Sequence, residues 1–152
     1  MYSVTHAAVG GALGAALEVG IGAGGSVPVG GLGWGGVAFA VGIVSHAALD
    51  ALPHHDLKDV RLDVGLTLGA LAGLAAAGHL GTAVFWGALG AVVPDLEILF
   101  WRLGWIEERH WVFPSHNGRI PHGRALGRRW ILPQALVALG AYAVALWTGL
   151  GG

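Results

Sequence analysis

The stretch SHAALDALPHHDLKD, residues 45–59, is the part of the sequence that decides our interpretation of the chain. His46 and Asp50 are four residues apart, so on a helix their side chains lie on the same face. Pro53 ends such a helix, and His54 and Asp56 follow it closely. An imidazole and a carboxylate at the end of an apolar helix are costly to bury unless something compensates for their lost hydration. A metal ion would do so, and the alternative is a polar helix end in which the carboxylate pairs with the histidine.

The composition indicates a membrane protein. Of the 152 residues, 55% are hydrophobic and 11% are charged, whereas about 25% are charged in an ordinary soluble domain. Most of the 28 glycines fall inside apolar runs, and small residues let membrane helices approach closely. We therefore predict an all-α, polytopic membrane protein that forms one helical domain over residues 1–152. Glycine pairs at four-residue spacing are suited to such contacts: Gly10/Gly14, Gly20/Gly24, Gly31/Gly35 and Gly69/Gly73.

Several functional classes are disfavoured by the same composition. The chain has no cysteine, so a metal site would use histidine and carboxylate rather than thiolate. The net charge of -1 argues against a nucleic-acid-binding surface. The first residues lack a basic segment, so we expect no cleaved signal peptide.

Five apolar runs predict about five Gly/Ala-rich helices, some of them short or tilted. The third and fourth runs are shorter than the roughly twenty residues that cross a bilayer, so they are the weakest candidates for full spans. The fourth run covers residues 83–93 and has an apolar continuation to residue 101. A polar loop, residues 102–129, carries arginines and histidines and precedes the last helix. The other runs cover residues 5–27, 31–52, 64–78 and 130–150.

The distribution of basic residues predicts a topology. Lys58 and Arg61 follow the second run, and six arginines lie in the loop of residues 102–129, whereas the other connections have no lysine or arginine. The positive-inside rule makes both basic segments cytoplasmic. We therefore expect a multi-pass protein of the cell inner (cytoplasmic) membrane, with its N-terminus inside and its C-terminus outside. This topology brings His6, the ends of the second and fourth runs and the loop to the cytoplasmic face.

Three further residues are candidates for the same site. Asp95 follows Pro94 at the end of the fourth run, where it is either a helix N-cap or a second carboxylate ligand or general base. His116 is the histidine of the loop that we favour as a ligand, although a basic loop can also simply contact anionic lipid headgroups. His6 is a candidate because of the topology. His110 and His122 rank lower.

Four motifs resemble the family of membrane-bound metal-dependent hydrolases of bacterial and archaeal inner membranes. They are Thr-His at residues 5–6, Ser-His-x-x-x-Asp-x-x-Pro-His at 45–54, Gly-Ala-x-x-Pro-Asp-x-Glu at 90–97 and Ser-His at 115–116. The His-x-x-x-Asp spacing is also similar to that of zinc-dependent phospholipase C. The chain departs from the family pattern at Glu97, where a second aspartate is usual. The resemblance implies six metal ligands: His6, His46, Asp50, His54, Asp95 and His116.

If the chain is an enzyme, we expect it to hydrolyse a phosphoester or ester, with a lipid as the natural substrate at a membrane face. Zinc would lower the pKa of bound water from 15.7 to about 7, and manganese or iron also suits these ligands. Asp95 would act as a ligand, bridge or base, and His116 as a ligand or general acid. Asp56 would orient a ligating imidazole. Arg119 and Arg124 would bind a phosphate group.

Two alternatives stay open at this point. Histidines at helix ends can hold a haem or another cofactor, or can form a path for protons or metal ions, in a membrane subunit that is not an enzyme. The chain can also be a structural small subunit whose membrane-protein partners satisfy its polar groups. The sequence does not decide whether His54 or His55 is the ligand.

Overall fold

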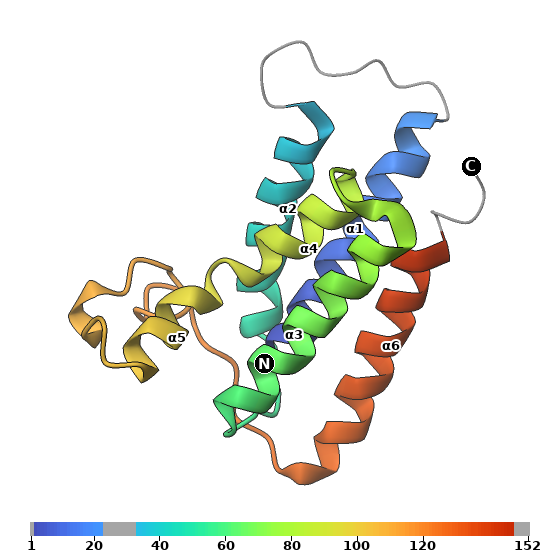
Figure 1. Ribbon diagram of the computed structural model, residues 1–152. Coiled ribbons are helices and arrows are strands. Elements are labelled where there is room, and N and C mark those ends of the chain that lie inside the picture. Colours follow the sequence, from blue (N-terminus) through green and yellow to red (C-terminus); the bar gives the residue numbers. More distant parts are fainter. Residues whose placement is uncertain (1, 23–32, 148–152) are drawn as a thin grey trace.

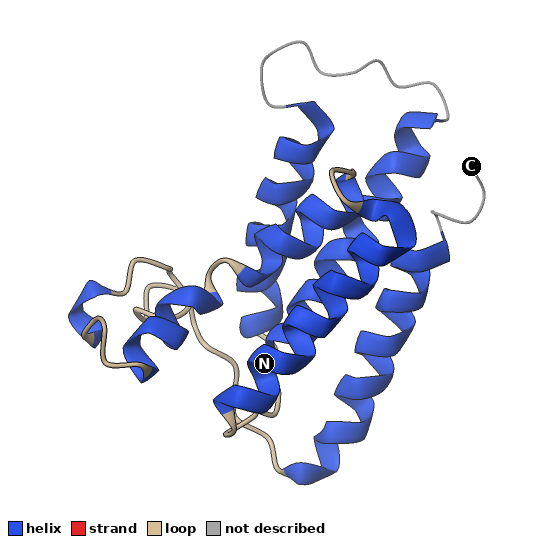
Figure 2. Cartoon of the chain, viewed as in Figure 1, coloured by secondary structure: helices blue, strands red, loops and turns tan. Residues whose placement is uncertain are grey.

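A computed structural model describes residues 2–22 and 33–147, and over these residues the chain is all-α, as predicted (Figures 1 and 2). The described residues form no strand. Gly24 and Gly31, from two of the predicted glycine pairs, lie outside these residues. The helices are α1 (Ser3–Gly22), α2 (Gly33–Asp50), α3 (Val60–Leu74), α4 (Ala83–Val92), α5 (Asp95–Arg102) and α6 (Ile131–Trp147).

The predicted number of about five helices is not confirmed, because the described part of the chain has six α-helices. The difference arises where the fourth apolar run was expected to continue to residue 101. The run is divided at Pro94 into α4 and α5, which meet at 44°. A proline has no backbone N–H for the helical hydrogen bond, and its ring clashes with the preceding turn of a continuous helix. As a result α5 leaves the bundle of the other helices (Figure 1).

Glycines bring α4 into direct backbone contact with α1 and α2. A Cβ atom added to Gly10 would overlap the carbonyl oxygen of Gly87, and one added to Gly14 would overlap that of Ala83. Gly42 of α2 is equally close to the Gly87 carbonyl. The expectation of close helix approach is thus met at Gly10 and Gly14, but Gly69 of α3 faces open space.

Glu18, a charged residue in the middle of the first apolar run, has a structural role at the opposite end of the bundle from the predicted site. Its Oε1 accepts a hydrogen bond of 2.6 Å from the backbone N–H of Ala83, the first residue of α4. The first turn of a helix leaves N–H groups without partners inside the helix. Glu18 satisfies one of them, which explains a carboxylate in an apolar helix without a catalytic role.

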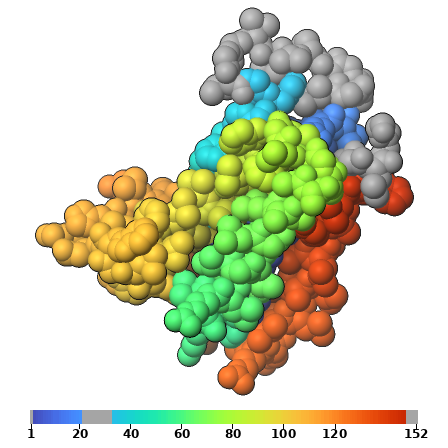
Figure 3. All heavy atoms as spheres, viewed as in Figure 1, coloured from blue at the N-terminus to red at the C-terminus, as the bar shows by residue number. Residues whose placement is uncertain are grey.

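The helices α3 and α6 lie on the surface of the molecule (Figure 3), where they expose apolar side chains. Two segments are long and apolar enough to cross a membrane, Val60–His79 and Arg128–Trp147, and only 11% of each is buried. The bent pair α4 and α5 passes the same test if it counts as one span. α1 and α2, whose apolar runs were also predicted to cross the membrane, are not among the candidates found over the described residues, and parts of both runs lie outside these residues. The exposed side chains include Leu62, Leu66, Leu68, Leu132, Leu136, Val137 and Leu139.

The glycine contacts predict that alanine substitutions at two positions change the free energy of unfolding differently. Gly14→Ala should lower the free energy of unfolding in detergent by about 1–3 kcal/mol, because its Cβ overlaps the Ala83 backbone. Gly69→Ala should leave that free energy unchanged or raise it by up to about 1 kcal/mol, because alanine favours the helix and meets no atom there. Chemical unfolding monitored by circular dichroism measures both values. Equal effects of the two substitutions would contradict the packing described here.

Candidate metal centre

Five of the six sequence-predicted ligands lie together at one end of the bundle, and we call them the central cluster. His6 comes from the start of α1, His46 and Asp50 from the end of α2, Asp95 from the start of α5, and His116 from the loop after α5. His6 Nε2 is 3.2 Å from Asp50 Oδ1, and His46 Nε2 is 3.0 Å from Asp50 Oδ2 and 3.8 Å from Asp95 Oδ1. These side chains include two overlapping groups that could hold a metal ion.

His46 is oriented by a backbone carbonyl on α4. Its Nδ1–H donates a hydrogen bond of 2.8 Å to the carbonyl oxygen of Ala91, which can only accept. The proton of the neutral ring is therefore on Nδ1, and Nε2 presents its lone pair to the carboxylate of Asp50. A second group that fixes the tautomer of an imidazole is typical of metal-ligating histidines.

His116 is oriented in the same way by Glu97. Its Nδ1–H donates a hydrogen bond of 2.7 Å to Glu97 Oε1, and the Glu97 carboxylate also accepts hydrogen bonds from the backbone N–H groups of Val112 and Phe113. The loop is thereby attached to α5 with its histidine directed at the cluster. In the sequence, Glu97 was noted only as a departure from the family pattern, although its position two residues after Asp95 could have indicated a role near the site.

Three atoms with lone pairs converge inside the central cluster. His116 Nε2 lies 3.4 Å from His46 Nε2 and 3.4 Å from Asp50 Oδ2. The Nδ1–H groups of His46 and His116 already donate to Ala91 and Glu97, so in the neutral rings both Nε2 atoms carry lone pairs. A proton or a cation is therefore required between these rings and the carboxylate of Asp50. Burial lowers the pKa of His116, but its hydrogen bonds to Asp50 and Glu97 outweigh burial, so the pKa lies above its usual value. A metal ion would have to displace that proton.

Buried atoms without partners also favour a cation here. Both ring nitrogens of His6 and Oδ2 of Asp95 are buried, and among the described residues they make no hydrogen bond of acceptable geometry. The ring of His6 is fully buried and stacks on that of His46 with centroids 3.9 Å apart. Unsatisfied buried polar groups cost about 1–3 kcal/mol each. Metal coordination would compensate for that cost, so the residues fit the metal that the motifs imply.

The sixth predicted ligand, His54, lies in a separate group that we call the outer cluster: His54, Asp56 and His122. His54 was predicted in one ligand set with His46 and Asp50, whereas in the structure its ligand atom is grouped with those of Asp56 and His122. The chain turns away from α2 at Pro53, which directs His54 to Asp56, with Nε2 3.0 Å from Asp56 Oδ1. Asp56 was expected only to orient a ligand, and His122 was ranked low.

His54 and His55, which the sequence did not distinguish as ligands, differ in their contacts. His55 Nδ1–H donates a hydrogen bond of 2.8 Å to the carbonyl oxygen of Leu126. Its backbone N–H donates to Gln134 Oε1 of α6 over 2.6 Å. His55 therefore attaches the segment after α2 to the end of the loop and to α6, while His54 is directed into the outer cluster.

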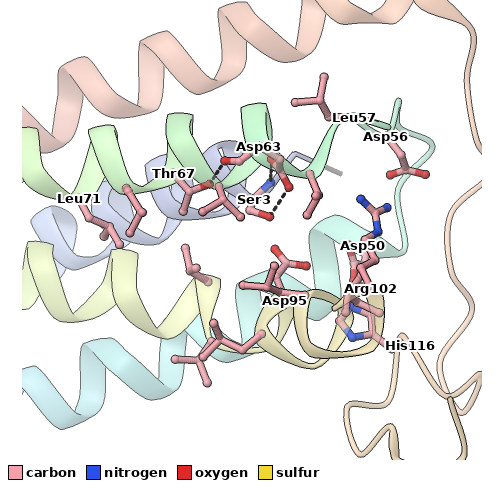
Figure 4. Close-up of a pocket in the computed structure, with 18 of the residues that line it drawn as sticks. Ser3, Asp50, Asp56, Leu57, Asp63, Thr67, Leu71, Asp95, Arg102 and His116 are labelled. Carbon is pink, nitrogen blue, oxygen red and sulfur yellow. Dashed lines mark hydrogen bonds and ion pairs between the residues drawn. The ribbon is translucent and has the colours of Figure 1, made fainter. Parts of the chain in front are cut away.

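A cavity of about 380 Å³ extends from the central cluster between α3 and the pair α4 and α5. Asp50, Asp95 and His116 line its polar end, while Leu71 lies toward the other end (Figure 4). Asp63 of α3 accepts hydrogen bonds from Ser3 on this wall. The remaining wall is mainly aliphatic: Val60, Val64, Leu68, Leu71, Leu89, Val92, Val93, Leu96, Ile98 and Leu99.

The arginine that lines this cavity is not one of the two that were predicted to bind a phosphate. Arg102, the last residue of α5, lines the cavity. Arg119 and Arg124 are exposed on the loop and do not line it. The sequence does not indicate which of these arginines lies beside the cavity, because their distances from the central cluster depend on the path of the loop.

Comparison of the chain with protein-family models, with curated proteins and with solved structures gives no match. The chemistry of the site is therefore judged from its own donor atoms. Imidazole nitrogens and carboxylate oxygens without thiolate are a donor set that zinc, manganese and iron accept.

The role of Glu97 generates a prediction. Glu97→Gln removes the charge that holds the Nδ1–H of His116, so divalent metal should bind about 10- to 100-fold more weakly, as is usual for such orienting groups. Glu108→Gln, at an exposed position of the same loop, is the matched control and should leave affinity unchanged. Metal titration of the detergent-purified proteins by calorimetry measures the difference. Equal affinity of both variants would show that Glu97 has no influence on the centre.

Proposed function

We propose that this chain is a membrane-embedded, metal-dependent hydrolase that acts on a phosphoester or ester of a lipid. The observation that carries the proposal is a cluster of oriented imidazoles and carboxylates at the polar end of an aliphatic cavity. The volume of about 380 Å³ falls in the range of small-molecule sites, about 300–1,000 Å³. An amphiphilic substrate matches both ends of this cavity.

The central cluster would hold the metal. His46, Asp50 and His116 supply the converging donor atoms, and His6 and Asp95 lie close enough to complete the set. Zinc is the first choice, and manganese or iron is also compatible. When bound, such a cation supplies Lewis acidity and a nucleophilic hydroxide at neutral pH.

Residues around the centre would have distinct roles. Asp95 Oδ2, which lacks a hydrogen-bond partner among the described residues, would accept a proton from the attacking water. Attack of that water oxygen at the ester phosphorus or carbonyl carbon would break the ester bond, and the departing alkoxide would take up the proton that Asp95 accepted. Arg102 on the cavity wall would bind an anionic phosphate, since its guanidinium matches phosphate geometry.

The membrane arrangement follows from the apolar outer helices and the basic segments. We infer that the helices cross the inner membrane, with the N-terminus in the cytoplasm and the C-terminus outside. The central cluster then lies at the cytoplasmic face. Membrane lipid contacts α3 and α6, whose exposed leucines and valines favour hydrocarbon over water. A lipid substrate can therefore reach the cavity without leaving the bilayer surface.

Elemental analysis of detergent-purified protein, prepared without chelators and offered metal, tests the proposal. The wild type should retain divalent metal in stoichiometric amount and hydrolyse lipid phosphoesters or esters in a screen. A His46→Ala/Asp50→Ala variant should lose both the metal of the central cluster and the activity. His110→Ala, at an exposed histidine, should retain both.

Negligible metal in the wild type after metal has been offered back would overturn the proposal. A bound coloured cofactor would instead support a cofactor-holding membrane subunit. Retained fold and metal without any hydrolysis would favour a metal-binding subunit that is not an enzyme.

A further inference from the structure

We propose that the outer cluster binds a second divalent cation, and that Asp50 bridges it to the cation of the central cluster. The bridging rests on the proposed metal centre, whereas the outer site stands on its own contacts. Its three ligand atoms, from His54, Asp56 and His122, lie within 4.8 Å of one another.

His54 is the strongest indication of this second site. It is fully buried, and its Nδ1–H donates a hydrogen bond of 2.7 Å to the carbonyl oxygen of Leu52. Nε2 is therefore directed at the outer cluster. Although Asp56 Oδ1 is 3.0 Å away, Nε2 makes no hydrogen bond of acceptable geometry among the described residues. A buried imidazole that is held by a hydrogen bond at one nitrogen, and has at the other a nearby carboxylate without a well-aligned hydrogen bond, is prepared for a ligand.

His122 and Asp56 complete the site from the solvent side. Their side chains are 43% and 47% exposed, so an ion can reach the buried nitrogen of His54 between them. The rings of His54 and His122 meet edge to face with centroids 4.8 Å apart. An ion pair of His54 with Asp56 does not require His122, whereas a cation site does.

Backbone hydrogen bonds fix the two contributing segments to each other. The N–H of Gly123 donates to the carbonyl oxygen of Asp50 over 2.6 Å, and the N–H of Leu126 donates to that of His54 over 2.6 Å. A side chain on Gly123 would overlap the carbonyl group of Leu52. His122 is thus held beside His54, although the two residues are far apart in the sequence. The site is therefore formed before a cation binds.

Asp50 lies between the two clusters. Its Oδ2 is 3.0 Å from His46 Nε2 on one side and 4.0 Å from His122 Nδ1 on the other. Because Oδ2 faces both clusters, this one carboxylate oxygen would be shared by the two ions, and two-metal hydrolytic sites hold their ions about 3.5–4 Å apart. Two imidazoles and one carboxylate favour zinc, manganese or iron over magnesium or calcium. The second cation would contact the leaving oxygen while the first supplies the nucleophile.

Metal stoichiometry with zinc alone as the probe tests the second site. Full-length detergent-purified protein is saturated with zinc, freed of excess and analysed for zinc per chain. We expect two equivalents in the wild type and in His110→Ala, and one in His122→Ala/Asp56→Asn. The two substitutions lie at exposed positions, and circular dichroism confirms that the variant is folded. His122→Ala alone should bind the second zinc ion at least tenfold more weakly than the wild type. Calorimetry measures this affinity independently of the stoichiometry.

The outcomes separate the two proposals. One equivalent in both the wild type and the double variant would overturn the second site and leave the central metal centre intact. Two equivalents in both would also overturn it, since the outer residues would then not be ligands. No zinc in the wild type would overturn both proposals. Two equivalents that fall to one in the double variant, and also in His46→Ala, establish two sites.

Discussion

The burial of the Asp50 carboxylate is the constraint on which the rest of the site depends. Its side chain is only 2% exposed, and a buried charge is costly unless charged or polar partners surround it. His6, His46 and His116 approach it from three separate segments, and Ser115 donates a hydrogen bond of 2.7 Å to Oδ2. The ends of α1 and α2 and the loop after α5 therefore have to meet at one point.

Glycine packing makes that meeting possible. Because α4 touches the backbones of both α1 and α2 at Gly10, Gly42 and Gly87, the three helices lie closer than larger side chains would allow. The Ala91 carbonyl of α4 then reaches the ring of His46. These small residues leave little aliphatic volume between the helices. They thereby bring the donor atoms of the site close to one another. The leucine-rich surfaces face outward on α3 and α6, the reverse of a water-soluble domain.

The loop between α5 and α6 turns a polar helix end into a site with two adjoining clusters. Glu97 directs His116 at the central cluster, while the hydrogen bonds of Gly123 and Leu126 hold His122 beside His54. Asp50, Asp56 and Asp95 of these clusters also line the cavity between α3 and α5. Two clusters of imidazoles and carboxylates that could hold metal ions, and a mainly aliphatic cavity, are thereby joined at one end of the bundle.

The sequence by itself determined the features that depend on local geometry. Helical periodicity was enough to place His46 and Asp50 on one face, and the low charge content with glycine-rich runs was enough for the all-α class. Pro53 was recognisable as the end of a helix for the same local reason. Only the tertiary structure decided that Glu97 orients His116, that His122 rather than His46 is the neighbour of His54, and that Arg102 lines the cavity. These contacts join segments whose separation in space depends on the path of an irregular loop, and no periodicity in the sequence encodes that path.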